Sequence, residues 1–398
     1  MLLMLALIML VLVIRSHRRY GSWINPITAF VLWDFVLFTA IPIQFGSLYL
    51  EGVSAQGFNK FTTIQYIYIL GGIVGFTLIP LNAYFRFFST GPRYFLQGKA
   101  LSPGLIWLLS LATIVVLFVA LASAGGGGFM WITDTRSAYI SHRAGAGVFW
   151  LLITWLSIAV LGYVLFKYKP KSILKLCLLL IPFLILGFFT GSKHNLITPL
   201  IVGVLYHEYF IRSIRFFWLV AITVFLAVVF TVILFVQSSM GEFSWFKGVY
   251  YFSEYATTSI RYLGDEFLPI GLGQYSLSDL WYYVPRGLYP DKPFEYGVLN
   301  IHEVLFPGAA AIGNTPGISN WMLVYIDFGH IGVFVFGLFL TSFSLFLFNL
   351  FEKNRGSSFI FLFMIHVSIF QLFALWPALG TGLILFLILH FRYGKKML

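Results

Sequence analysis

Charged side chains are scarce in this sequence, which has 398 residues of which 10% are charged and 60% are hydrophobic. A soluble domain carries about 25% charged residues, so the composition excludes an ordinary soluble protein. Runs of about 20 apolar residues recur along the chain, each long enough to cross a bilayer, and they leave no room for a separate soluble domain. We therefore expect residues 1–398 to form one integral membrane domain.

Several signatures of function are also missing. The single cysteine, Cys177, excludes a disulfide framework. The eight histidines are scattered and no pair of carboxylates has the spacing of a divalent-ion site, so we expect neither a metal nor a cofactor. No phosphate-binding loop and no Gly-x-Ser-x-Gly elbow is present. The net charge of +11 fits basic cytoplasmic loops, and no nucleic-acid motif accompanies it.

The apolar runs predict an all-α polytopic membrane protein with about eleven transmembrane helices. The first run is short, and its basic residues follow the apolar stretch, the reverse of a cleaved signal peptide. The expected spans are 1–14, 27–45, 63–85, 105–124, 148–166, 173–190, 196–211, 217–237, 329–350, 358–376 and 378–391.

Most lysines and arginines fall on alternate loops between these spans. Short cytoplasmic loops are enriched in these residues, so the pattern orients the chain. The N-terminus is predicted outside and the C-terminus in the cytoplasm. The large loop 240–328 and the smaller loop 125–147 are both predicted on the outer face.

The smaller loop opens with the glycine run 125–128, which cannot continue a helix stably. If 133–143 is helical, Arg136 and Arg143 share one face. Arginine binds phosphate with a planar fork of donors. We favour a pyrophosphate clamp over a helix that merely touches lipid headgroups, because headgroup contact needs no glycine hinge.

Three other places carry isolated polar groups. The turn 190–195 places Lys193 at a helix start, where it is either a second phosphate ligand or part of an ordinary polar turn. The proline-rich strap 285–293 holds Arg286 and Lys292 on a stiff backbone. Asp34, in the middle of a span, is either functional or an interhelical hydrogen-bonding group.

The large loop begins with a stretch, 243–262, that reads as an aromatic-rich helix. Glu254, Thr258, Arg261 and Asp265 follow the spacing of one helical face. An interfacial aromatic belt is one explanation. A stripe with acid and base exceeds what a belt requires, so Glu254 and Arg261 are treated as site candidates.

At these residues the chain resembles the Wzy-type oligosaccharide repeat-unit polymerases, or O-antigen polymerases, which are related to O-antigen ligases. The resemblance covers roughly 125–335 and the count of spans. The motifs that carry it are Arg136…Arg143-Ala-Gly-Ala-Gly147, Gly191-Ser192-Lys193, Pro285-Arg286…Tyr289-Pro290-Asp-Lys292-Pro293, and Thr315-Pro316-Gly317 with Asp327-Phe328-Gly329…Gly332.

The resemblance implies a GT-C-like, metal-independent glycosyltransferase in the bacterial inner membrane, with its site facing the periplasm. Such an enzyme transfers a growing glycan from undecaprenyl pyrophosphate to a new lipid-linked repeat unit, with inversion at the anomeric carbon. The implied partners are the two lipid-linked glycans, membrane lipid and a chain-length-regulating co-polymerase.

Fixed cations suit the charge that develops on the leaving pyrophosphate, and the acceptor hydroxyl suits a nearby base. The residues expected at the pyrophosphate are Arg136, Arg143, Lys193, Arg261, Arg286 and Lys292. The candidate bases are Glu254, Asp265, Glu266, His302 and Glu303. The His-Asn pair of the ligases aligns near Ser319-Asn320, which leaves the base open or unnecessary.

Three other functions compete with this interpretation. The first is an O-antigen ligase, against which the missing His-Asn pair argues. The second is a transporter or flippase for a lipid-linked sugar, which predicts charges at the membrane midplane rather than on one face. The third is a structural subunit that presents its aromatic loop to a partner.

Overall fold

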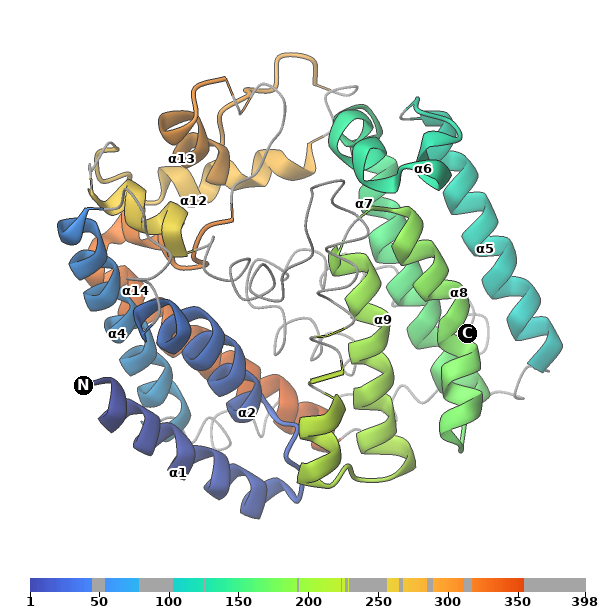
Figure 1. Cartoon of the computed structure of the whole chain (residues 1–398), viewed down its shortest axis with the longest axis horizontal. Helices are drawn as coiled ribbons and strands as arrows, with labels where there is room; N and C mark the ends of the chain where they lie inside the picture. Colours follow the sequence, from blue (N-terminus) through green and yellow to red (C-terminus); the bar gives the residue numbers. More distant parts are fainter. Residues whose placement is uncertain are drawn as a thin grey trace, which may run out of the picture. The chain divides into compact units, whose positions relative to one another are not determined.

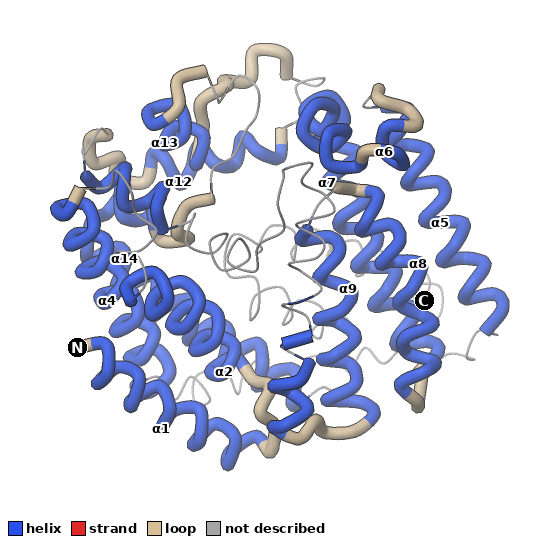
Figure 2. Tube along the Cα trace, viewed as in Figure 1, coloured by secondary structure: helices blue, strands red, loops and turns tan. Residues whose placement is uncertain are grey.

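The computed structural model describes residues 1–44, 54–78, 103–124, 126–191, 193–222, 224–225, 228, 256–264, 268–284, 289–308, 310 and 317–353. Within these residues all regular structure is helical and no strand occurs (Figure 1 and Figure 2). The all-α prediction is therefore confirmed for the part that is described. The chain divides into two compact units, which are described separately: Met1–Arg19, Pro26–Ala83 and Phe243–Leu345 form the first, and Tyr20–Asn25, Tyr84–Glu242 and Phe346–Leu398 form the second.

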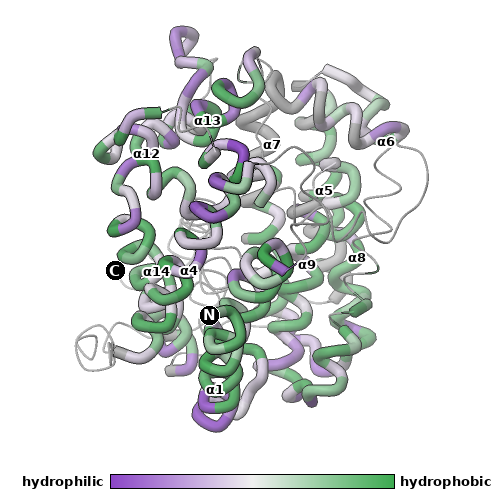
Figure 3. The backbone as a smooth tube through the Cα atoms, turned by 60° about the vertical axis from the view of Figure 1, so that its left-hand side comes forward, coloured by the Kyte–Doolittle hydropathy of each residue, from purple (hydrophilic) through white to green (hydrophobic). Residues whose placement is uncertain are grey.

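The helices carry apolar side chains both on the face that packs against other helices and on the exposed face. In α1 (Leu2–Tyr20), Leu5 and Met9 are buried, whereas Leu3 and Leu7 on the other side are 75% and 57% exposed. Helices α5 (Pro103–Ala124) and α8 (Ile173–Phe189) are likewise hydrophobic along most of their length (Figure 3). A surface helix of a soluble protein would be polar on its outer face. The pattern is that of a membrane protein.

Two described helices are long and apolar enough to cross a membrane, Pro26–Gln44 and Met322–Phe346. Three shorter apolar helices accompany them: Leu156–Leu165, Ile173–Phe189 and Asn195–Ile211. These match the positions of expected spans. The expected spans 358–376 and 378–391, and most of 217–237, lie outside the described residues. The count of eleven and the orientation remain predictions.

The second unit is built on α5, α7 (Thr135–Tyr168), α8 and α9 (Lys193–Tyr206), which lie side by side (Figure 1). Helix α9 continues into a π-helical turn, η3 (His207–Ile211). A buried aliphatic and aromatic core joins α7, α8 and α9. Helix α7 ends where Lys169 turns left-handed before Pro170, because proline cannot continue a helix.

The first unit contains α1, α2 (Pro26–Phe30), the π-helix η1 (Val31–Ala40), α4 (Ala55–Leu78) and a helical stretch at 256–264. It also contains the short elements of the large loop and the long helix that follows them. These are α12 (Gln274–Ser278), η4 (Asp279–Tyr283), α13 (Val298–Leu305) and α14 (Met322–Lys353), of which the residues from Phe346 on belong to the second unit.

Helices α4 and α14 touch backbone to backbone. A Cβ placed on Gly71 would lie 2.2 Å from the carbonyl oxygen of Phe334, and one on Gly337 would lie 2.4 Å from that of Tyr68. Small residues permit this approach between membrane helices. The close contact on α14 involves Gly337, whereas no heavy atom lies within 4 Å of a Cβ placed on Gly329. Gly329 instead interrupts α14 with φ 61° and ψ −152°.

Candidate functional site

The glycine run before α7 forms a turn whose conformation is fixed by contacts with neighbouring side chains. Gly126, Gly127 and Gly128 all have positive φ, so the expected break in the helix is confirmed for these three. The His142 ring covers Gly127, where a Cβ would lie 2.8 Å from His142 Cδ2. Trp131, fully buried, donates its indole N–H to the Gly126 carbonyl at 3.4 Å. The turn is therefore fixed against the first turns of α7.

Helix α7 includes the whole of 135–143, so the condition for Arg136 and Arg143 to share a face is met. The helix begins at Asp134, whose carboxylate accepts a hydrogen bond from the Ser137 N–H at 3.1 Å. Hydrogen bonds from the side chain and then the backbone of Ser137 lower the pKa of Asp134. This cap sets where the helix starts, and thus the register of both arginines.

The turn between α8 and α9 packs directly on this helix start. A Cβ on Gly191 would lie 2.4 Å from the Thr135 carbonyl oxygen and 2.7 Å from the Tyr139 Cβ. With φ +63° at Gly191, only glycine fits this contact without strain. The backbone that leads to Lys193 is thereby held against the first turn of α7, beside Arg136. The backbones of two segments that the sequence analysis offered as candidate phosphate-binding segments are therefore in contact.

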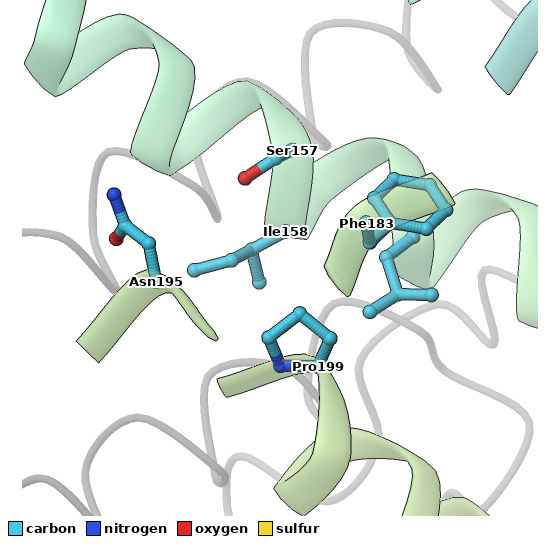
Figure 4. Close-up of a pocket in the computed structure, with 6 residues that line it drawn as sticks. Ser157, Ile158, Phe183, Asn195 and Pro199 are labelled. Atoms are coloured by element: carbon cyan, nitrogen blue, oxygen red, sulfur yellow. The ribbon is translucent and has the colours of Figure 1, made fainter. Parts of the chain in front are cut away.

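A buried hydrogen-bond chain closes the same turn. The Asn195 side-chain amide donates to the Thr190 hydroxyl at 3.2 Å, and that hydroxyl donates to the Gly187 carbonyl at 2.7 Å. A cavity of about 10 Å³ lies beneath, lined by Ser157 and Asn195 among apolar groups (Figure 4). That volume suits about one water molecule between polar partners. The start of α9 is thus fixed by the Asn195–Thr190–Gly187 hydrogen bonds as well as by its contact with α7.

The candidates in the large loop fall in the first unit. Arg261 is exposed on the helical stretch 256–264. Lys292 is buried, with its ammonium 4.5 Å from the ring centroid of Tyr296, a cation–π contact. His302 is buried against the Phe306 ring. The remaining candidates lie outside the described residues: Glu254, Asp265, Glu266 and Arg286.

Glu303 closes the turn after α13. Its carboxylate accepts the backbone N–H groups of Gly308 and Ala310, at 2.5 and 2.9 Å. These two hydrogen bonds, Gly308 first, lower the pKa of Glu303. A carboxylate held as an anion in this way is a poor proton acceptor at neutral pH. The geometry argues for a structural cap, whereas the catalytic role expected from the sequence stays a prediction.

Replacement of Glu303 by glutamine separates the two roles. If it is a cap, Glu303→Gln keeps an acceptor oxygen and most of the activity; if it is the general base, activity falls by roughly 100-fold or more. We expect the first result. Since the folded pKa is lowered, the cap stabilises the folded state above the ordinary glutamate pKa. This stabilisation is lost as the pH falls through the lowered pKa of Glu303.

Both parts of this prediction can be measured on one protein. Initial rates of the glycan transfer that the resemblance implies, compared between wild type and Glu303→Gln, test the catalytic role. Hydrogen exchange at the Gly308 and Ala310 amides, corrected for intrinsic rates, tests whether Glu303 protects these two N–H groups. Protection in the wild type should fall at acid pH more than in the variant. A pH-independent difference between the two would contradict the cap.

Asp34, the buried acid in η1, has a partner on another helix. The Tyr68 hydroxyl donates to Asp34 Oδ1 at 2.9 Å, and the Asn320 amide donates to the Tyr68 oxygen at 3.3 Å. This bears out the interhelical hydrogen-bond interpretation. The π-helical turn at η1 is a feature often found at functional positions.

Two buried acids were assigned no role in the sequence analysis, although Asp327 belongs to one of its motifs. Asp327 is 0% exposed and its carboxylate binds α12 through the N–H groups of Tyr275 and Ser276. Glu208, buried in η3, accepts from the hydroxyls of Ser22 and Ser213. Each stands alone in an apolar stretch, which was the available signal. Ser276, which binds Asp327, and Ser22, which binds Glu208, are far from these acids in sequence, and Ser213 lies in a short loop with no recognisable motif.

Comparison with known proteins finds two curated relatives. Both are named O-antigen polymerase, one from Salmonella typhimurium (strain LT2) and one from Salmonella typhi. Each is 23% identical to this chain over 254 residues, which is 62% of this chain and 61% of the relative. No protein-family profile matches the chain, and no solved structure does. The resemblance found in the motifs is confirmed, over about three fifths of the relatives' length.

Proposed function

We propose that this chain is a membrane glycosyltransferase that polymerises lipid-linked oligosaccharide repeat units of a surface polysaccharide such as O-antigen. The name of its relatives supports this function. The observation that carries the proposal is the contact of Gly191 with Thr135 and Tyr139, which sets the start of α9 against the start of α7. The contact supports the proposal because Thr135 and Gly191 are next to the backbone segments that carry Arg136 and Lys193.

The chemistry proposed there needs cations more than it needs a metal. An acceptor sugar hydroxyl attacks the anomeric carbon of the donor. A new C–O bond forms, the bond to the pyrophosphate oxygen breaks, and the configuration inverts. The hydroxyl proton leaves to a base or to water, and negative charge grows on the lipid pyrophosphate. Fixed Arg136, Arg143 and Lys193 stabilise that charge as it develops.

The start of α9 adds to this stabilisation. Free N–H groups at a helix N-terminus attract anions, and α9 begins at Lys193 itself. The turn is held by the buried chain through Asn195 and Thr190, so it need not reorganise during the reaction. At α7 the Asp134 cap already engages the Ser137 N–H, so there the arginines are the phosphate-binding groups.

The finer features of the proposal rest on the resemblance and on loop charge. They are an undecaprenyl carrier, a site on the periplasmic side of the inner membrane, a GT-C-like arrangement of about eleven spans, and a co-polymerase that sets chain length. Arg261, Arg286 and Lys292 are proposed as further cations for the lipid-linked substrates. The base remains unassigned among Glu254, Asp265, Glu266 and His302, with Glu303 disfavoured by its capping role.

The test is reconstitution with one purified lipid-pyrophosphate-linked repeat unit, in the presence of a chelator. We expect a ladder of products that differ by one repeat. Transfer only to a lipid A core acceptor would instead identify a ligase. Movement of the lipid-linked unit across a liposome bilayer without a ladder would identify a transporter. A ladder that disappears in chelator would overturn the metal-independent mechanism.

A further inference from the structure

The segment 268–280, here called the α12 elbow, exposes a group of large apolar side chains. Ile270, Leu272 and Leu277 are 70%, 81% and 66% exposed, and α12 itself has no buried residue. Asp279 is the only charged residue in the elbow. A loop in water would carry polar residues at such positions, and exposed apolar patches mark interaction surfaces.

Leu272 also has an unusual backbone. Its φ of 49° places a leucine in the left-handed region, which bulky residues rarely adopt. The Leu272 N–H donates to the Asp327 carbonyl at 3.1 Å, which helps to hold that conformation. Strain of this kind persists where the surroundings enforce it and where it serves a purpose. Here it turns the most exposed side chain of the elbow outward.

The elbow is fastened to α14 by a buried carboxylate. Asp327 accepts the N–H groups of Tyr275 at 3.1 Å and Ser276 at 2.7 Å, and the Ser276 hydroxyl at 2.5 Å. The Gly271 N–H donates to the Ile326 carbonyl at 3.2 Å. This set of hydrogen bonds fixes the depth and direction of the elbow relative to the start of α14.

The exposed face of α14 starts at the same place. Ile331, Val335 and Phe339 are at least half exposed and follow the 4-4 spacing of one helical face, and Phe328, just before the interruption at Gly329, is 50% exposed. Helix α14 is a candidate membrane span by its length and composition, so we expect this apolar face to contact lipid. A Cβ on Gly273 would lie 3.3 Å from Phe328 Cζ, so the elbow adjoins that face.

We propose that the α12 elbow lies within the bilayer, at the boundary between headgroups and acyl chains, with Ile270, Leu272 and Leu277 in the acyl region. The partner is lipid rather than a second copy of the chain, because the exposed residues continue the lipid-facing stripe of α14. Short amphipathic segments bind membranes in this way through buried apolar area. The elbow thus anchors the large loop at the depth where a lipid-linked headgroup lies. The inference does not depend on the proposed glycan chemistry.

Spin-label accessibility in lipid nanodiscs tests the depth. In a Cys177→Ser background, labels at Leu272→Cys and Leu277→Cys are compared with Val335→Cys as a membrane reference and Glu295→Cys as an aqueous reference. We expect the two elbow labels to collide with oxygen more than with a water-soluble nickel complex, as at Val335. Nickel accessibility equal to that at Glu295 would overturn the proposal. Exclusion of both reagents, as in a contact between two copies, would overturn it too.

The anchor is tested by Asp327→Asn in the labelled Leu272→Cys protein. The amide loses part of the acceptor capacity that binds Tyr275 and Ser276, so the label should gain nickel accessibility at least twofold while the Val335 label is unchanged. An unchanged Leu272 label would contradict the anchoring role of Asp327. The depth measurement with Asp327 intact stands regardless of how this variant folds.

Discussion

Replacing Arg136 by alanine is expected to lower the rate of polymer formation by on the order of 100-fold or more, the usual cost of losing one preorganised group at a developing negative charge. Arg136 stands at the contact between the start of α7 and the turn before Lys193. The initial rate of ladder growth from a lipid-pyrophosphate-linked repeat unit, in chelator, measures the effect. A structural subunit that only presents its loop would tolerate the change.

Companion variants make this result specific. Lys193→Ala should lose activity on a similar scale, and Arg136→Lys should restore part of it, because lysine keeps the charge but not the forked geometry. Lys171→Ala, an exposed cation at the other end of α7 and α8, is the matched control and should leave the rate within about twofold. If Lys171→Ala lowers the rate as much as Arg136→Ala does, net charge rather than position governs the rate. That result would contradict the proposed pyrophosphate clamp.

Replacing Gly71 by leucine is expected to destabilise the protein by about 3 kcal/mol or more, the upper range for overpacked interiors. Even the first carbon of the new side chain would lie 2.2 Å from the Phe334 carbonyl oxygen, so α4 and α14 must separate. The separation would also strain the Tyr68 contact with Asn320. The midpoint of thermal unfolding in detergent measures it, and should fall by several degrees.

The neighbouring residue provides the control. Leu70 is 40% exposed, and Leu70→Ala at the next position should shift the midpoint little. Gly337→Leu, on the opposite helix, should behave like Gly71→Leu because its Cβ would meet the Tyr68 carbonyl. Equal midpoints for Gly71→Leu and Leu70→Ala would show that the two helices are not in backbone contact.

Local features were readable from the sequence because their causes are local. The glycines of 126–128 break the helix since glycine adopts positive φ freely, and Thr190 and Gly191 form a turn shortly before α9 begins at Lys193. The hydrophobic runs located the spans that are described. Arg136 and Arg143 lie on one helix as their spacing required.

Contacts between distant segments were not readable. Nothing in the sequence near Gly191 says that Thr135 will lie against it, and nothing near Asp327 names Ser276 as its partner. Acidic residues of the large loop were predicted as candidate bases because an acceptor sugar hydroxyl needs a base nearby. That Glu303 accepts the backbone N–H groups of Gly308 and Ala310 becomes visible only in the structure, and its catalytic role stays a prediction.

The length of α7 shows a further limit of hydropathy. The apolar run 148–166 marked the span, but the helix begins at Thr135, because the Asp134 cap and the ordered turn behind it let the polar stretch 135–147 stay helical. A run of hydrophobic residues indicates which part of the chain is expected in the acyl region. It does not report where the hydrogen-bonded helix starts.

The length of α7 allows the depth of its residues relative to the bilayer to be estimated. Its 34 residues extend about 51 Å at 1.5 Å per residue, against about 30 Å of hydrocarbon, so about 20 Å of helix stands clear of the acyl chains. If Lys169 lies near one interface, we expect Arg143 near headgroup level at the other and Arg136 roughly 10 Å farther out. Under the proposed function, α7 would then carry one arginine at the height of a lipid phosphate and a second at the height of the sugars attached to it.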